Sequence, residues 1–140
     1  MSAPSRVIVG WKGERQYEAQ REGRPSILLD GDGMAGPAPT DALLSALAVC
    51  VSVDVVDILA KRRTPVESYS VEVLGERVDT IPRRFKQITL NISIQGKGIE
   101  RPHAENAIDL AVRKYCSVGA SLAPDITVLW NLLLNEPALT

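Results

Sequence analysis

The chain has 140 residues, a net charge of −1 at pH 7, 45% hydrophobic residues and 24% charged residues. This length predicts a single domain, residues 1–140, with one hydrophobic core, and this composition excludes a disordered chain. The balanced charge argues against a nucleic-acid partner and against an anionic membrane surface. No apolar segment follows a basic one at the start of the chain, so we expect a cytoplasmic protein.

The first part of the chain predicts a small antiparallel sheet. Residues 6–12 are rich in β-branched and aromatic side chains, and residues 14–20 and 25–30 continue that pattern. Residues 31–39 contain three glycines and two prolines, which predicts a loop. We expect the loop to end at Thr40, as the N-cap of a helix.

A long apolar helix is predicted from Asp41 to about Arg63. Asp54 and Asp57 lie within it, and each would cost roughly 3 kcal/mol at the centre of a bilayer, so we predict a core helix and no membrane span. A helix that is apolar on nearly every face must be covered on nearly every face. Because a chain of this length is short for that task, we predict a homodimer with these helices at its centre.

The second half of the chain predicts two further strands, a helical region and a last strand. Residues 67–78 and 85–95 alternate apolar and polar side chains and are expected to pair as a hairpin. A helix is predicted over residues 102–115, then a short helix or a bent continuation near residues 116–123, then a strand over residues 126–134. The order is βββ-α-ββ-α(α)-β, which is an α+β fold.

Cys50 and Cys116 are the candidates for chemistry. In a reducing compartment a structural disulfide does not persist. Together with His103 the two cysteines match no zinc-site spacing, so we expect no metal. Only a thiolate is nucleophilic, and both apolar burial and Asp54, one turn after Cys50, oppose its formation. The residues alone leave two alternatives for Cys50, an inert packed thiol or a reactive thiol with a cationic partner.

Two alternatives also stand for Cys116. If the helix continues through it, Arg113 lies on the same face and favours the thiolate. If a new helix begins there, the helix N-terminus favours it instead.

Two motifs resemble those of the OsmC/Ohr family, the osmotically inducible and organic hydroperoxide resistance proteins. The first is GPAPTDALLSALAVC over residues 36–50, continued by VDVVDIL over residues 53–59. The second is RKYCSV over residues 113–118, which is similar to the OsmC-like branch of that family. The resemblance extends over residues 6–134.

The resemblance implies an intertwined homodimer, with antiparallel sheets packed around long central helices, and no cofactor. It also implies a thiol peroxidase that reduces organic hydroperoxides. In such an enzyme Cys50 would attack the peroxide as a thiolate and become a sulfenic acid. Cys116 would condense with it to a disulfide, and an external dithiol, of the lipoyl type in the best-understood members, would reduce that disulfide.

The resemblance further implies an activating arginine and an acid. We assign the arginine to Arg21, with Arg15 and Arg24 as alternatives. Asp41, nine residues before Cys50, is the acid available where the family carries a glutamate. Along a straight helix these two residues are roughly 13 Å apart on opposite sides, so Asp41 would act only across a break or through an arginine. Otherwise Asp41 complements the helix dipole.

We expect the apolar part of a substrate to lie against Leu43, Leu44, Leu47 and Val51. The alternative function is a non-catalytic dimer that binds a small apolar ligand at the subunit interface.

Overall fold

A computed structural model describes residues 2–137 of the chain. The chain forms two compact units, one up to Leu43 and one from Leu44 onward. Helix α1 (Pro39–Lys61) begins in the first unit and continues into the second. The two units are described separately below, and the single-domain organisation stays a prediction.

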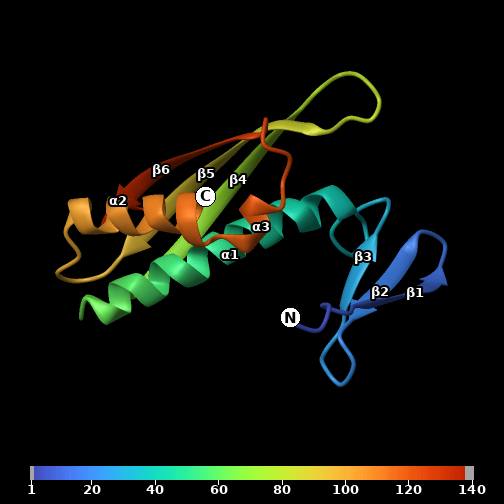
Figure 1. Ribbon diagram of the computed structural model, residues 1–140, viewed down its shortest axis with the longest axis horizontal. Helices are drawn as coiled ribbons and strands as arrows, with labels where there is room; N and C mark the ends of the chain where they lie inside the picture. The colour runs from blue at the N-terminus through green and yellow to red at the C-terminus, as the bar shows by residue number, and fades with distance from the viewer. Residues whose placement is uncertain (1, 138–140) are drawn as a thin grey trace. The chain divides into compact units, whose positions relative to one another are not determined.

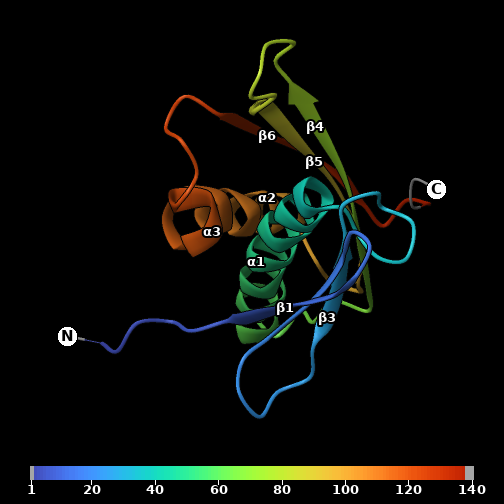
Figure 2. The ribbon, with the colours of Figure 1, turned by 90° about the vertical axis from the view of Figure 1, so that its right-hand side faces the viewer.

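The first unit contains the expected three-stranded antiparallel sheet, in the order β1-β2-β3 (Figures 1 and 2). Its strands are β1 (Ile8–Gly13), β2 (Gln16–Gln20) and β3 (Ile27–Asp30). Large apolar side chains on this sheet are exposed, among them Trp11 at 67%. An exposed apolar sheet of this kind is typical of a surface that another chain covers.

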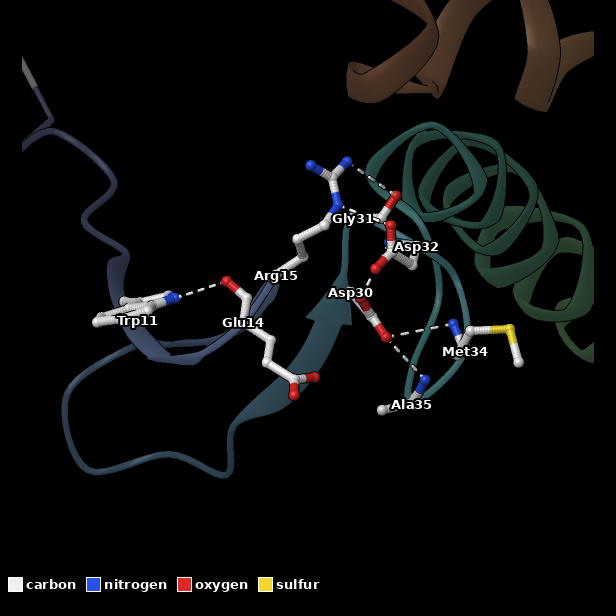
Figure 3. A network of polar contacts seen from close by, with 8 residues as sticks. All are labelled: Trp11, Glu14, Arg15, Asp30, Gly31, Asp32, Met34 and Ala35. Atoms are coloured by element: carbon white, nitrogen blue, oxygen red, sulfur yellow. Dashed lines mark hydrogen bonds and ion pairs between the residues drawn. The ribbon is translucent and has the colours of Figure 1, made fainter.

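The loop after β3 is folded around the carboxylate of Asp30 (Figure 3). This carboxylate is buried and accepts backbone N–H bonds from Asp32 at 2.9 Å, from Met34 at 3.3 Å and from Ala35 at 2.9 Å. The three N–H groups lower the pKa of Asp30, and the nearby charge of Arg15 lowers it further. Asp30 therefore holds a glycine- and proline-rich segment in one conformation immediately before helix α1.

Helix α1 begins two residues earlier than expected, at Pro39 in place of Asp41. The N–H of Ala42 bonds to the carbonyl of Ala38 at 2.9 Å, so Pro39 occupies the first turn and Thr40 lies inside the helix. Proline fits this position because the first N–H groups of a helix have no intrahelical partner. The helix is long and apolar enough to cross a membrane by length and composition, and 28% of its most apolar stretch is buried.

The second unit contains one sheet and the helices on one of its faces (Figures 1 and 2). Its remaining elements are β4 (Ser68–Arg77), β5 (Phe85–Gln95), α2 (Arg101–Leu110), the π-helical turn η1 (Ala111–Tyr115), α3 (Ser117–Ala120) and β6 (Thr127–Leu134). The sheet order is β4-β5-β6. The predicted element order is confirmed.

Strand pairing in this sheet differs in one respect from the expected antiparallel pattern. Strands β4 and β5 form the predicted antiparallel hairpin, but β6 pairs parallel to β5. A parallel neighbour needs a long crossover, and the helical segment of residues 101–120 provides it.

The core of the second unit lies between the sheet and helices α1 and α2. Alternate residues of β5 are fully buried, with Ile88, Leu90 and Ile94 at 0% exposure. From α1, the fully buried residues are Leu47, Val51, Val55 and Leu59, and from α2 they are Ala104, Ala107 and Ile108. This core fixes the face of α1 that points at the sheet, and thereby the direction in which Cys50 projects.

Candidate active site

Cys50 lies near the middle of α1, close to the core face of the helix. It is half-buried and packs against the hydrophobic core, and its thiol is free. The helix continues without a break on both sides of it. Cys50 is therefore held by a rigid element while part of its side chain stays open to solvent.

Cys116 lies where the helical segment after β5 changes direction. The π-helical turn η1 ends with an N–H bond from Cys116 to the carbonyl of Ala111 at 2.9 Å. Cys116 itself has an extended backbone and is the N-cap of α3. A new helix thus begins at Cys116, which is the second of the two sequence-based alternatives. Arg113 instead pairs with Asp109, with Nε and Oδ1 2.6 Å apart.

The sulfur of Cys116 accepts backbone hydrogen bonds from the turn that it caps. The N–H of Gly119 donates to it at 3.2 Å, and the N–H of Val118 also faces it and lowers its pKa. Gly119 packs closely here, since a Cβ atom at this position would lie 3.4 Å from the sulfur and 3.5 Å from Leu47 Cδ1. Sequence analysis missed these two N–H donors, because backbone groups leave no residue-type signal.

The two cysteine side chains lie in the second unit, near enough for Cys50 to influence the pKa of Cys116. Burial raises the pKa of Cys116, whose side chain is only 4% exposed. The neighbouring Cys50 side chain raises that pKa further. Proximity of the two sulfurs is what a two-cysteine redox cycle requires.

The predicted arginines all lie in the first unit. Arg15 pairs with Asp32 at 2.7 Å beside the Asp30 loop (Figure 3). Arg21 and Arg24 line a polar pocket of about 270 Å³ together with Arg6 and Glu22. The assignment of an activating arginine stays a prediction.

Asp41 lies in the first turn of α1, where its charge complements the helix dipole. Its expected part in activating Cys50 also stays a prediction.

The four predicted substrate-contacting residues differ in their exposure, and their contact with a substrate stays a prediction. Leu47 and Val51 are each 1% exposed and belong to the core, because their face of α1 is turned toward the sheet. Leu44 is half-buried against the same core, and Leu43, in the first unit, is 38% exposed. Leu47 also lies against Gly119 of the Cys116 turn.

A separate apolar groove of about 380 Å³ runs between α1 and β4. Val49 and Val71 are among its apolar lining residues, and Ser45, Ser52 and Tyr69 add hydroxyl groups. The Tyr69 hydroxyl is buried and has no hydrogen-bond partner among residues 2–137, and its burial raises the pKa of Tyr69. Ser52 lies near enough to offset part of that shift, although its own hydroxyl donates to the carbonyl of Ala48 at 2.6 Å.

Comparison with known proteins identifies the family. Residues 30–131 match the family model described as OsmC-like protein. The chain belongs to the OsmC-like family. A curated relative, Protein YhfA of Escherichia coli strain K12, is 35% identical over 103 residues, which are 73% of this chain and 77% of YhfA.

Solved structures show the same OsmC-like fold. An OsmC-like protein from Mycoplasma pneumoniae superimposes with a TM-score of 0.82 at 18% identity, covering 97% of this chain and 100% of that one. The organic hydroperoxide resistance protein OhrB of Bacillus subtilis gives a TM-score of 0.61 at 14% identity, covering 94% and 98%. The family resemblance and the α+β fold expected from the sequence are therefore confirmed. Membership of this family suggests a peroxide-related function.

Proposed function

We propose that this OsmC-like protein is a thiol-dependent peroxidase that reduces organic hydroperoxides through Cys50 and Cys116. The observation that carries the proposal is the proximity of these two side chains, which come from α1 and from the turn before α3. Their free thiols are the cysteines of the two family motifs. Cys50 is the more accessible of the two, and Cys116 lies buried beside it.

The accessibility assigns the order of the steps. The Cys50 thiolate attacks the terminal oxygen of the hydroperoxide, the O–O bond breaks, and the alcohol leaves after taking up one proton. Cys50 is then a sulfenic acid. The Cys116 sulfur attacks the Cys50 sulfur, the S–O bond breaks, the oxygen leaves as water after protonation, and a disulfide remains. An external dithiol reduces the disulfide by two thiol–disulfide exchanges and becomes oxidised itself.

The first test uses the two cysteine variants. Cys50→Ser is expected to abolish hydroperoxide reduction, and Cys116→Ser is expected to stop the cycle at a sulfenic acid on Cys50 that a dimedone probe can trap. Mass spectrometry of the labelled protein locates the adduct. Hydroperoxide reduction that survives Cys50→Ser would refute the proposal.

We also propose that the working unit is a homodimer. Both units carry large exposed apolar side chains, including Val9 at 60% and Trp11 at 67% in the first unit, and Val49 at 60% and Val53 at 53% on α1. Side chains of this size are seldom left uncovered in such number on a monomer. A second copy of the chain would cover them.

The groove between α1 and β4 favours a second candidate function, the binding of a small apolar ligand without catalysis. Its apolar lining and the unpartnered Tyr69 hydroxyl suit a ligand with one polar group. The two functions differ in one observable. A peroxidase loses both thiols when an organic hydroperoxide is added, whereas a binding protein keeps them.

A further inference from the structure

Two buried polar side-chain atoms of residues 2–137 lack a hydrogen-bond partner, and both belong to strand β4. They are the hydroxyl of Tyr69 and the Nε of Arg77. Exposed and half-buried residues alternate along β4, and Tyr69 and Arg77 are both at half-buried positions. Tyr69 also lines the apolar groove between α1 and β4. The two unpartnered atoms therefore lie on the face of β4 that borders this groove.

The Arg77 guanidinium lies beside the ring that adjoins the end of the groove. Its Cζ is 5.5 Å from the centre of the Phe85 ring. The same ring packs against Gly75, where a Cβ atom would lie 2.5 Å from Phe85 Cε1. Gly75 is the next half-buried position of β4 after Val73, which lines the groove. The apolar lining thus continues from Val73 to the Phe85 ring and ends at a positive charge.

Arg77 has no acidic partner in the part of the chain that the structure describes. It takes part in none of the ion pairs among residues 2–137. Its neighbour Glu76 is at an exposed position of β4 and accepts a hydrogen bond from Gln87 at 2.6 Å. A guanidinium stays charged at neutral pH, and partial burial without an anion is unfavourable. An anionic group from outside the chain would stabilise it.

We infer that the groove between α1 and β4 binds an apolar chain that ends in a carboxylate, with the carboxylate on Arg77. Val71 and Val73 contact the chain, and the planar guanidinium matches the two oxygens and the single charge of a carboxylate. The groove volume of about 380 Å³ suits a chain of medium length. This inference rests on the ligand-binding candidate and adds the chemical class of the ligand.

The groove and Cys50 belong to different sides of α1. Cys50 is not among the residues that line the groove, whereas its neighbour Val49 is. Successive residues of an α-helix project roughly 100° apart, so Cys50 points away from the direction of Val49. The inferred ligand therefore has a site of its own, and its binding needs no chemistry at the cysteines.

Two probes that differ only in their polar end test the inference, decanoate and 1-decanol. Isothermal titration calorimetry is expected to show that the wild type binds decanoate about tenfold or more tightly, because the carboxylate gains charge-assisted hydrogen bonds. Arg77→Gln should lose this preference, and Arg77→Lys should keep part of it. Arg83→Gln, at an exposed residue after β4, is the control for a lost charge and should keep the full preference. Methyl NMR spectra should show shifts at Val71 and Val73.

Equal binding of the two probes by the wild type would overturn the inference and leave the apolar-ligand candidate standing, and this comparison needs no variant to fold. Binding of neither probe would remove both. Decanoate that shifts only residues of the first unit, where Arg21 and Arg24 line a polar pocket, would also overturn it. So would an Arg77→Gln variant that binds decanoate as the wild type does but sediments at lower mass, because Arg77 would then pair with a second copy of the chain.

Discussion

At the residue scale, Cys116 combines an observed structural role with the proposed chemical one. Its sulfur accepts the N–H of Gly119 as the N-cap of α3, and the same sulfur lies beside Cys50. A hydroxyl oxygen can replace the sulfur as a cap acceptor, but it cannot form a disulfide. The two roles can therefore be separated by substitution.

Cys116→Ser and Cys116→Ala are expected to differ in stability but to give the same products with a hydroperoxide. Serine keeps a cap acceptor for the Gly119 N–H, whereas alanine loses it at a cost of about 1 kcal/mol. Both variants should form a sulfenic acid at Cys50 and no disulfide. Urea denaturation measures the free energy of unfolding, and equal stability of the two variants would contradict the capping role.

The hydrogen-bonded carboxylate of Asp30 is expected to stabilise the loop before α1 by an amount that depends on pH. Folding lowers the pKa of its carboxyl below the ordinary value of 3.8, chiefly through the N–H groups of Ala35 and Asp32. The contribution is therefore fully present above pH 3.8 and is lost as the pH falls through the lower, folded-state pKa.

Asp30→Asn should accordingly be less stable than the wild type at neutral pH, with a difference that shrinks as the pH falls below 3.8. Hydrogen exchange at the amides of Asp32, Met34 and Ala35 reports the loop directly and should be faster in the variant. A stability difference that stays constant from pH 7 to acid would contradict this assignment.

At the element scale, the β4–β5 hairpin depends on a glycine that faces an aromatic ring. A Cβ atom on Gly75 would lie 2.5 Å from Phe85 Cε1, which is closer than carbon atoms approach, and 3.1 Å from Leu44 Cδ1, which is a tight contact. Phe85 is buried, so its ring cannot move aside freely. Glycine normally weakens a strand, but here it provides the space for the ring.

Gly75→Ala should destabilise the protein by about 1–3 kcal/mol, because overpacking outweighs the better strand propensity of alanine. In a Phe85→Leu background the same substitution should cost less, since the smaller side chain leaves room for a methyl group. A double-mutant cycle from urea denaturation gives the coupling between the two sites. Additive effects would show that the ring is not the obstacle.

Periodic patterns predicted the regular elements well. Alternation in residues 85–95 gave the bounds of β5, and its apolar positions Ile88, Leu90, Ile92 and Ile94 are buried. The start of α1 was wrong by two positions because Thr40 has a cap side chain, whereas Pro39 fits the first turn for a backbone reason. The sequence of β6 contains no pattern that distinguishes parallel from antiparallel pairing.

At the scale of the whole molecule, neither unit buries all of its large apolar side chains. We predicted a homodimer because one chain of this length is too short to cover a long helix that is apolar on nearly every face. Val49 and Val53 of α1 are exposed in the single chain, as that argument expects. Trp11, in a strand of the first unit, is exposed as well. An aromatic residue in a strand pattern does not reveal which chain covers it.

Val49→Glu combined with Val53→Glu should weaken the dimer by about 2 kcal/mol or more, because charges would enter the expected interface. Sedimentation equilibrium should give the wild type twice the chain mass of 15.2 kDa and the variant a lower average mass. Lys86→Glu, a charge reversal at an exposed residue of β5, serves as the control and should stay dimeric. A wild type that sediments as a single chain would contradict the account.

The candidate site was only partly predictable. Family motifs pointed to Cys50 and Cys116, but their spacing in the sequence does not report a distance in space. That the two side chains lie near each other depends on the π-helical turn at residues 111–115 and on the core that fixes the face of α1. Asp30 was missed, although an aspartate directly before a glycine-rich loop is a known turn signal.

The most direct test of the redox pairing is a count of free thiols before and after treatment with one equivalent of an organic hydroperoxide, followed by peptide mapping without reduction. We predict that both thiols of each chain disappear and that a single disulfide links Cys50 to Cys116. Retention of both thiols, or a disulfide that joins two copies of the same cysteine, would contradict the account.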